Sequence, residues 1–344
     1  SILDGASSIQ EYLDYSKEIG AKALGVTDHG YVIGAMELYT KAKKEGIVPL
    51  PGCEFYLTPD KDYTFVGRSY EYYHITVWAV NEKGYRNLLK LGSLSWNQDE
   101  LWGYSKSKTT GQYSLVTKPR VIKRFQNEKP RITFDELIQY GEGLVIGSGC
   151  ILGPIAKAYL NNEPAGAKRN LEKLLSEFRG RMYIELMSHD VTHNWDREKK
   201  GFIKNPCTDF SPDGNLQKSC NLKLIEVARQ YNLPLLMTVD SHFVKPEQKK
   251  LQDVLLQQGN PDSGWRFHNN YSMQSTDQAW THWSERYGDT EEYRKIFTEA
   301  IENQYQIVDL AKDISIKDDY HLPHIEIPTD IKEVSSNEVE QIKI

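Results

Sequence analysis

The chain has 344 residues, 39% of them hydrophobic and 26% charged, a balance typical of a folded globular protein and not of a disordered one. No apolar run approaches the roughly 18 residues of a membrane span, and the first residues lack the basic and apolar segments of a secretory signal. The net charge of −6 argues against a protein built mainly to coat nucleic acid, and four cysteines without a C-x-x-C pair favour a reducing cytoplasm.

Short apolar runs alternate with helical stretches along the chain. A capping box formed by Ser8 and Glu11 predicts the first helix. Buried strands are expected at 23–27, 47–57, 74–80, 144–147, 182–187 and 235–239. Helices are expected between these strands, including helices at 165–178 and 215–231.

Strands that alternate with helices predict an α/β fold with a parallel sheet, either open or closed into a barrel. Titratable residues lie at or just beyond the downstream ends of the predicted strands, where a barrel gathers its active site: Asp28, His29, Glu54, Cys150, His189, Asp240 and His242. His74 departs from this rule because it begins its strand. Since the chain opens on a helix, we expect that a strand before Ser1 is missing, which would bring the six visible strands to seven.

Two long segments interrupt the alternation. Segment 104–131 is strongly basic and contains three interleaved aromatic residues. It suits a solvated surface loop or a contact with a phosphate backbone equally well. Segment 189–220 is polar and rich in turn residues, so a second long loop is expected there. We expect one domain at 1–283, followed at 284–344 by a helical extension that ends in a charged tail.

Metal ions that activate water for phosphoester cleavage need histidine nitrogens and carboxylate oxygens on a rigid frame. Asp28 with His29, and Asp240 with His242, are strand-end pairs of this kind. Either pair alone is weak evidence, because such residues are more often turn and cap residues. Glu54 ends an apolar run, where an unpaired carboxylate is costly, so a metal or a nearby arginine is needed there.

His74 and Cys150 have two interpretations each. A lone histidine such as His74 is more often part of a core than a ligand. Cys150 could be a soft metal ligand or a small buried residue. The residue types alone leave both alternatives open.

Seven strings of residues, in this order and spacing, carry a resemblance to a known family. They are SILDGAS at 1–7, GVTDHG at 25–30, PGCE at 51–54, YHIT at 73–76, EGLVIGSGC at 142–150, LPLLMTVDSH at 233–242 and DYHLPHIEIP at 319–328. Together they resemble the polymerase-and-histidinol-phosphatase (PHP) domain at the front of bacterial DNA polymerase III alpha subunits. The last string is similar to the connector that leads into the polymerase palm.

The resemblance implies a distorted seven-stranded TIM-like β/α barrel that holds up to three divalent ions, zinc or manganese. Carried over by position, the implied metal ligands are Asp4, His29, Glu54, His74, Cys150, Asp240 and His242. All of these except Cys150 are also expected to act in catalysis. The implied activity is metal-dependent phosphodiester hydrolysis, with a 3′–5′ exonuclease used in proofreading as the leading interpretation.

One feature of the family does not occur in this sequence. Its opening His-x-His motif would lie just upstream of Ser1, so the chain as given is expected to bind metal incompletely. The implied partners are a DNA 3′ end or single strand, the remainder of a polymerase chain, and replisome subunits. The alternative is a catalytically inactive scaffold that stabilises the polymerase. A free-standing small-phosphate esterase fits the connector-like tail less well.

Overall fold

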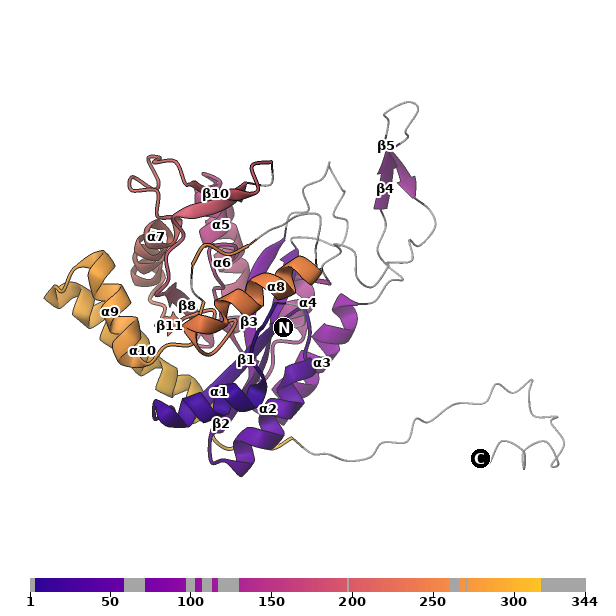
Figure 1. Cartoon of the computed structure of the whole chain (residues 1–344). Helices are drawn as coiled ribbons and strands as arrows, with labels where there is room; N and C mark the ends of the chain where they lie inside the picture. The colour runs from indigo at the N-terminus through magenta and orange to yellow at the C-terminus, as the bar shows by residue number, and fades with distance from the viewer. Residues whose placement is uncertain are drawn as a thin grey trace, which may run out of the picture.

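The computed structural model describes residues 4–58, 72–96, 103–106, 113–116, 130–196, 198–259, 266–269 and 271–316 (Figure 1). The elements, in chain order, are α1 (Ile9–Glu18), β1 (Ala23–His29), α2 (Ile33–Lys44), β2 (Val48–Thr58), β3 (Tyr73–Ala79), α3 (Glu82–Ser95), β4 (Gly103–Lys106), β5 (Tyr113–Val116), β6 (Arg131–Thr133), α4 (Phe134–Gln139), β7 (Leu144–Gly147), α5 (Ala156–Leu160), α6 (Pro164–Phe178), β8 (Met182–Met187), β9 (His193–Asp196), β10 (Gly201–Lys204), α7 (Leu216–Tyr231), β11 (Leu235–Thr238), a 3-10 turn (Pro246–Gln248), α8 (Lys249–Gly259), α9 (Thr276–Tyr287) and α10 (Glu291–Ala311).

A curled mixed sheet forms the centre of the molecule. Its strands follow the order β1-β2-β3-β7-β8-β11, and β6 adds to the far end of β2. The six strands of this path are the six that the apolar runs predict, with bounds that agree to within two residues. The capping box predicted at Ser8 and Glu11 is also present at the start of α1.

The expectation of an all-parallel sheet is wrong at β3. This strand runs antiparallel to both of its neighbours, β2 and β7, whereas β1 with β2, β7 with β8, and β8 with β11 are parallel pairs. A reversed strand presents its first residues at the edge where parallel strands present their last. The position of His74 near the start of β3 is therefore consistent with a site at the carboxyl ends of the other strands.

The two faces of the sheet are covered differently. Side chains such as Phe55, Ile75 and Leu144 point outward and pack under the surrounding helices in the main core. A smaller core occupies the concave side, where Ile307 and Ala311 of α10 pack against Trp78 and neighbouring strand residues. Because successive strand residues face opposite sides of the sheet, the same strands contribute to both cores. On the concave side, the positions beyond the smaller core remain for polar groups.

The path of the sheet has two ends, β1 and β11. A cavity of about 490 Å³ lies between them and is lined by both strands. On the β11 side, the side-chain amides of Asn303 and Gln304 in α10 donate to the carbonyl oxygens of Leu235 and Met237, at 2.7 and 2.8 Å. The closed seven-stranded barrel, with a further strand between these two ends, stays a prediction.

Other expectations meet the structure as follows. The loop expected at 189–220 is only partly a loop, because β9 and β10 form an antiparallel hairpin within it. The basic segment 104–131 lies mainly outside the described residues, as does the tail from 317 onward. The expected domain boundary at 283 falls inside α9, and the division into domains stays a prediction. Within the described residues, no helix is long and apolar enough to cross a membrane.

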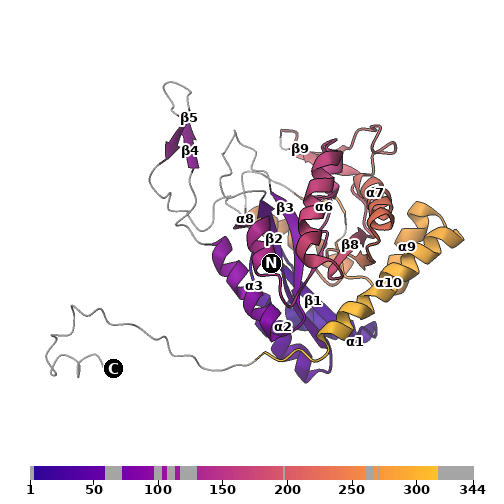
Figure 2. The same ribbon diagram turned by 180° about the vertical axis from the view of Figure 1, so that it is seen from behind.

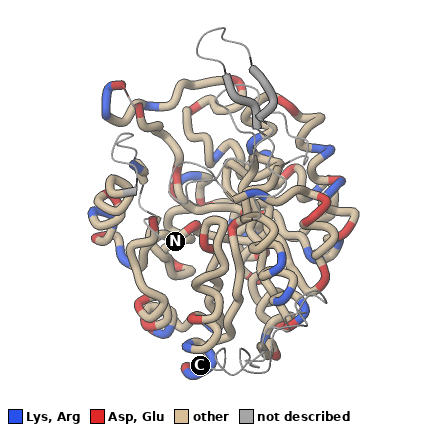
Figure 3. The backbone as a smooth tube through the Cα atoms, turned by 90° about the vertical axis from the view of Figure 1, so that its right-hand side faces the viewer, with Lys and Arg blue, Asp and Glu red and all other residues tan. Residues whose placement is uncertain are grey.

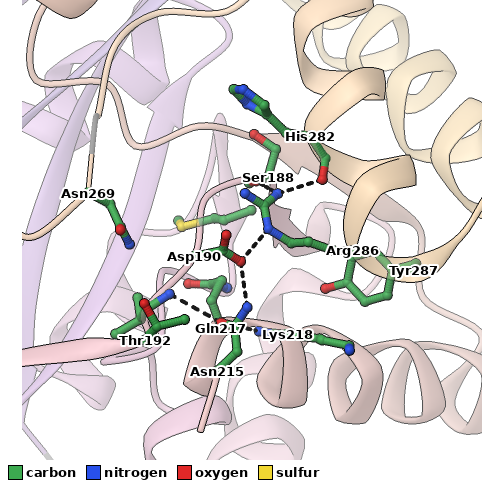
Figure 4. A network of polar contacts seen from close by, with 12 residues as sticks. Ser188, Asp190, Thr192, Asn215, Gln217, Lys218, Asn269, His282, Arg286 and Tyr287 are labelled. Carbon is green, nitrogen blue, oxygen red and sulfur yellow. Dashed lines mark hydrogen bonds and ion pairs between the residues drawn. The ribbon is translucent and has the colours of Figure 1, made fainter. Parts of the chain in front are cut away.

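The last helices are tied to the sheet by a network around Arg286 of α9 (Figure 4). The Arg286 guanidinium donates to a carboxylate oxygen of Asp190, to the carbonyl oxygen of Ser188, and, at 2.8 Å, to the carbonyl oxygen of His282. The Asn215 amide donates to the same oxygen of Asp190 at 2.5 Å. Thus one cation joins α9 to the segment that follows β8.

We expect Arg286→Ala to lower the free energy of unfolding by about 2–4 kcal/mol, because the half-buried Asp190 carboxylate loses its cation and the Ser188 carbonyl loses its Arg286 donor. Urea denaturation measures this loss. Arg294→Ala is the matched control, since its pair with Asp289 has both side chains more than half exposed (58% and 55%). The control should cost about 1 kcal/mol or less. Equal losses in the two variants would contradict the role given to Arg286.

Candidate metal centre

The predicted site residues come together at the upper edge of the sheet. His29 is the last residue of β1 and lies opposite Glu54 in β2. Glu54 in turn lies opposite Thr76 in β3, so that His74 is two residues closer to the start of that strand. Strand pairing alone therefore places one carboxylate between two histidines on the concave side of the sheet.

One oxygen of Glu54 accepts from both of these histidines. Its Oε1 lies 2.9 Å from His29 Nδ1 and 2.6 Å from His74 Nδ1. A carboxylate can only accept, so each histidine donates through Nδ1, and the Nε2 of His74 is left as a lone-pair donor. His74 Nε2 is buried and has no hydrogen-bond partner among the described residues. Cys150, three residues beyond β7, continues the cluster with its Sγ 3.8 Å from His74 Nδ1.

Cys150 reaches this position because the loop after β7 passes very close to β3. Gly149 has a positive φ of 75°, and a Cβ there would lie 2.2 Å from the His74 carbonyl oxygen. Only glycine permits both the backbone conformation and the close approach. The glycine in the string Ser148-Gly149-Cys150 thus positions the thiol beside the histidine.

On the other side of His29 the cluster continues through Asp4. The Asp4 Oδ2 lies 3.0 Å from His29 Nε2 and 3.5 Å from His242 Nε2. His242 Nδ1 donates to the carbonyl oxygen of Asp240 at 2.8 Å, and the Asp240 carboxylate is 3.9 Å from the same nitrogen. Asp240 has a φ of 46°, a conformation rare outside glycine that is often kept at functional sites.

The structure therefore joins all seven predicted ligands in one chain of contacts. The order is Cys150, His74, Glu54, His29, Asp4, His242, Asp240. The tightest group is Asp4, His29 and His242, which can each offer one ligand atom such that all three atoms lie within 4.8 Å of one another. The cavity between β1 and β11 reaches His29, Glu54, Asp240 and His242.

The charges in the cluster stabilise each other. Burial alone would raise the pKa of Asp4, but hydrogen bonds from His242 and His29 outweigh it and hold that pKa well below its usual value. Burial likewise opposes ionisation of Glu54, whose pKa is nevertheless held well below normal by His74 and His29. Burial disfavours the charged form of His29, yet the charge of Glu54 and the bond to Asp4 raise its pKa well above normal.

Asp240 and Cys150 behave in the opposite way. Burial raises the pKa of Asp240, and the charge of His242 offsets only part of this. Burial also raises the pKa of the Cys150 thiol well above its usual value, and the charges of Glu54 and Asp240 act in the same direction. A nearby divalent cation would favour the ionised form of both groups.

These residues fit divalent metal ions. The set mixes imidazole, carboxylate and thiol, which are the ligands of zinc and related ions. Among the described residues, the buried lone pair of His74 Nε2 has no hydrogen-bond partner, and a metal ion would satisfy it.

Comparison with known proteins shows the family of the chain. The family model of the PHP domain matches residues 1–189. The chain belongs to the PHP domain family. Two relatives are the DNA polymerase III alpha subunits of Treponema pallidum, 32% identical over 261 residues, and Borreliella burgdorferi, 30% identical over 260 residues. Each match covers 74% of this chain and only 18% of the relative, so the chain corresponds to an N-terminal part of such subunits. Among solved structures, a metal-dependent phosphoesterase from Bifidobacterium adolescentis aligns over 70% of this chain and 84% of its own, with 12% identity and a TM-score of 0.36.

Two titratable residues near the predicted strand ends of this PHP domain, Asp28 and His189, are not links in this chain of contacts. The Asp28 carboxylate accepts from the backbone N–H of Gly34 at 3.2 Å, near the start of α2. This contact with a free backbone N–H in the first turn of α2 is of the kind that a turn or cap residue makes. His29 as the ligand of the pair stays a prediction. His189 lies buried against Tyr271, with ring centroids 4.5 Å apart. Burial lowers its pKa to about 3, so it is a neutral residue beside the site.

The sequence did not indicate Glu185, which lies beneath the cluster in β8. Its Oε1 accepts from the Gly149 backbone N–H at 2.8 Å and from the Thr76 hydroxyl. These two donors are neighbours of Cys150 and His74 in the chain, so Glu185 fixes the segments that carry both ligands. The signal for this role is a single carboxylate in the otherwise apolar strand MYIELM.

Burial raises the pKa of Glu185 to about 7, above the value of 4.5 of a free side chain. In the unfolded chain Glu185 loses its proton near pH 4.5, while in the folded chain it keeps it up to about pH 7. Unfolding therefore releases a proton between these values, and stability falls as pH rises through this window. The shift corresponds to about 3 kcal/mol.

Glu185→Gln, which stays neutral, should abolish this dependence. Relative to the variant, the wild-type chain should lose about 3 kcal/mol between pH 4.5 and 7, measured by urea denaturation with a chelator present. The other titrating groups are shared and cancel in the difference. Parallel pH profiles for the two proteins would contradict the raised pKa.

Proposed function

We propose that this PHP domain is a metal-dependent phosphodiesterase that removes nucleotides from a DNA 3′ end, as part of a DNA polymerase III alpha-type chain. The observation that carries the proposal is the single chain of contacts among seven residues from six separate segments. Such a concentration of buried carboxylate and imidazole is costly unless it binds a cation. Proofreading, and association with replisome subunits, belong to the same proposal.

Each side chain would have a defined task. His29, His74 and His242 offer ring nitrogens, and Asp4, Glu54 and Asp240 offer oxygens, with Cys150 as a soft ligand next to His74. Glu54 also sets the orientation of two rings by accepting from both Nδ1 atoms. When bound, divalent ions supply Lewis acidity for the phosphate and activate water at neutral pH.

The cavity beside the cluster leaves space for the terminal nucleotide of a strand, and it is bordered by Thr27, Thr238 and Ser241. On the face drawn in Figure 3, the described basic and acidic residues are interspersed. With a net charge of −6, attraction of a polyanion must come from bound cations and local basic groups.

The proposal is tested by metal content together with degradation of a 3′-labelled single strand. His29→Ala and Asp240→Asn should each lower bound metal and abolish metal-dependent cleavage. Lys83→Ala, which changes an exposed residue at a distant surface pair, is the matched control. Bound metal without any cleavage by the wild-type chain would refute the nuclease.

The scaffold alternative rests on one observation. The carboxylates and histidines in the structure pair with each other, so the cluster can hold its shape as a set of ion pairs. A scaffold requires only that the wild-type chain stay folded after chelation and that its stability be unaffected by added metal. A large rise of melting temperature with manganese or zinc would argue against it.

A further inference from the structure

A cluster of aromatic rings and cations lies on the β9–β10 hairpin, which the metal centre does not use. The hairpin pairs Trp195 with Phe202 and His193 with Lys204. Because alternate residues face the same side of a strand, these four side chains share one face of the hairpin. The hairpin follows β8 after a short segment (188–192), and Figures 1 and 2 both show it at the top of the molecule.

A second segment, 266–269, completes the cluster. The His268 ring stacks on His193 with centroids 4.0 Å apart, and it meets Phe202 edge-on at 5.1 Å. Trp195 meets Phe202 at 5.1 Å, and the Arg266 guanidinium lies 5.7 Å from the centre of the Trp195 ring. We call these six residues the hairpin cluster: His193, Trp195, Phe202, Lys204, Arg266 and His268.

The composition of the hairpin cluster is unusual for a packing contact. Phe202 is 37% exposed, and His268 and Lys204 are exposed as well. Four of the six side chains are basic. Burial lowers the pKa of His193, and the nearby His268 and Lys204 lower it further. The basic groups are therefore close enough for each to disfavour a charge on its neighbour. Asp196, which pairs with Lys199, lies on the opposite face of the hairpin by register. Exposed rings beside basic groups are suited to bases and phosphates.

The hairpin cluster also lies next to the metal centre. Phe267, between Arg266 and His268, contacts the ring of the predicted ligand His242 at a centroid distance of 5.1 Å. It packs on Tyr271 at 4.6 Å, which fixes the segment. The ring that touches the predicted ligand His242 and the exposed ring of His268 therefore belong to consecutive residues. A strand whose 3′ end reaches His242 would have its preceding nucleotides within reach of the hairpin cluster.

We propose that the hairpin cluster is a stacking platform for the bases of a single DNA strand whose 3′ end is held at the metal centre. This inference rests on the proposed function, because it assigns the substrate of that site. Unpaired bases expose the flat faces that Phe202, Trp195 and His268 can stack on, and duplex DNA does not. Lys204 and Arg266 would contact the phosphates between those bases.

Binding is tested on the full chain with a fluorescently labelled oligothymidylate of about 12 nucleotides, by anisotropy in the presence of a chelator so that no cleavage occurs. Phe202→Leu keeps an apolar side chain but removes the ring, and Phe202→Tyr keeps the ring. We expect Phe202→Leu to weaken binding by about fivefold to a hundredfold, and Phe202→Tyr to retain it. His268→Ala should weaken binding in the same range.

Leu89→Ala, at an apolar residue of α3 that is 42% exposed and does not line the cavity, is the matched control and should bind as the wild-type chain does. Melting temperatures show whether each variant is folded. Unchanged binding in folded Phe202→Leu and His268→Ala would overturn the platform. Equal binding of a duplex of the same sequence would also overturn it, and tighter, ring-dependent binding of RNA would overturn the assignment to DNA.

Cleavage by the wild-type chain is measured separately with added manganese. If the wild-type chain cleaves the strand and Phe202→Leu binds it as tightly as the wild-type chain does, the platform is refuted and the nuclease is supported. Ring-dependent binding without any cleavage would support the platform and refute the nuclease. The two failures are therefore distinguishable.

Discussion

Glu54→Gln is expected to remove metal and metal-dependent hydrolysis together. The carboxylate is 4% exposed, and its Oε1 is shared by His29 and His74. An amide has the same shape but no charge, and its NH₂ group faces donors if it turns toward the rings. Groups that merely orient metal ligands typically change affinity or activity 10–100-fold, so we expect a loss of at least about a hundredfold.

Metal content after dialysis and the rate of phosphodiester cleavage measure this loss. The matched control is Glu45→Gln, because Glu45 accepts from Gln10 and pairs with Lys17 well away from the cluster. Retention of full metal content by Glu54→Gln would contradict its place at the centre of the site. Retained metal with lost cleavage would instead limit Glu54 to an effect on the reaction.

Much of the fold could be predicted because its signals are local. The apolar runs that form β7 and β8 are bounded as predicted, since each is a short buried strand flanked by turn residues. The direction of β3 could not be predicted in this way. Its side-chain pattern is the same for either direction, and the sequence between the two predicted strands has no periodic signal that would indicate one.

The candidate site was predictable to a different degree. Spacing alone did not distinguish Asp28 from His29. In the structure, Asp28 accepts from the Gly34 N–H in the first turn of α2, whereas His29 faces Glu54. The resemblance to the PHP domain supplied Asp4, which no strand-end rule indicates. The hairpin β9–β10 was missed because its strands, HNWD and GFIK, have only four residues each and show no alternation of apolar and polar side chains.

Metal binding should strengthen as pH rises through the range where His29 and His242 lose their protons. In the structure both nitrogens of His29 face carboxylates, and His242 has its pKa raised, against burial, by Asp240 and Asp4. These protons balance the charge of Asp4 and Glu54. A divalent ion competes with these protons for the same ligand atoms. For each proton that metal displaces, the apparent dissociation constant of the metal should therefore fall about tenfold per pH unit.

The stability of the metal-free chain should change in the opposite direction. A histidine whose pKa is raised on folding contributes stability that is complete below its unfolded value of 6.5 and disappears as pH rises through the folded value. Asp4 and Glu54 have lowered pKa values, and their contribution is lost only in acid. As pH rises above 6.5, therefore, the chelated protein should become less stable, and the stabilisation that metal adds should grow.

Melting temperatures with manganese and with chelator, compared across this range, should diverge as pH rises. Calorimetric titration in buffers of different ionisation enthalpy counts the protons that metal displaces. His29→Asn should release fewer protons than the wild-type chain, whereas His282→Asn, outside the cluster, should release the same number. A metal-induced rise in melting temperature that is constant from pH 6.5 to 9 would show that no histidine proton is exchanged for metal. In that case the ion would be held by groups that bind without losing a proton, namely ionised carboxylates such as Asp4 and Glu54 and the lone pair of His74 Nε2, and not by the Cys150 thiol.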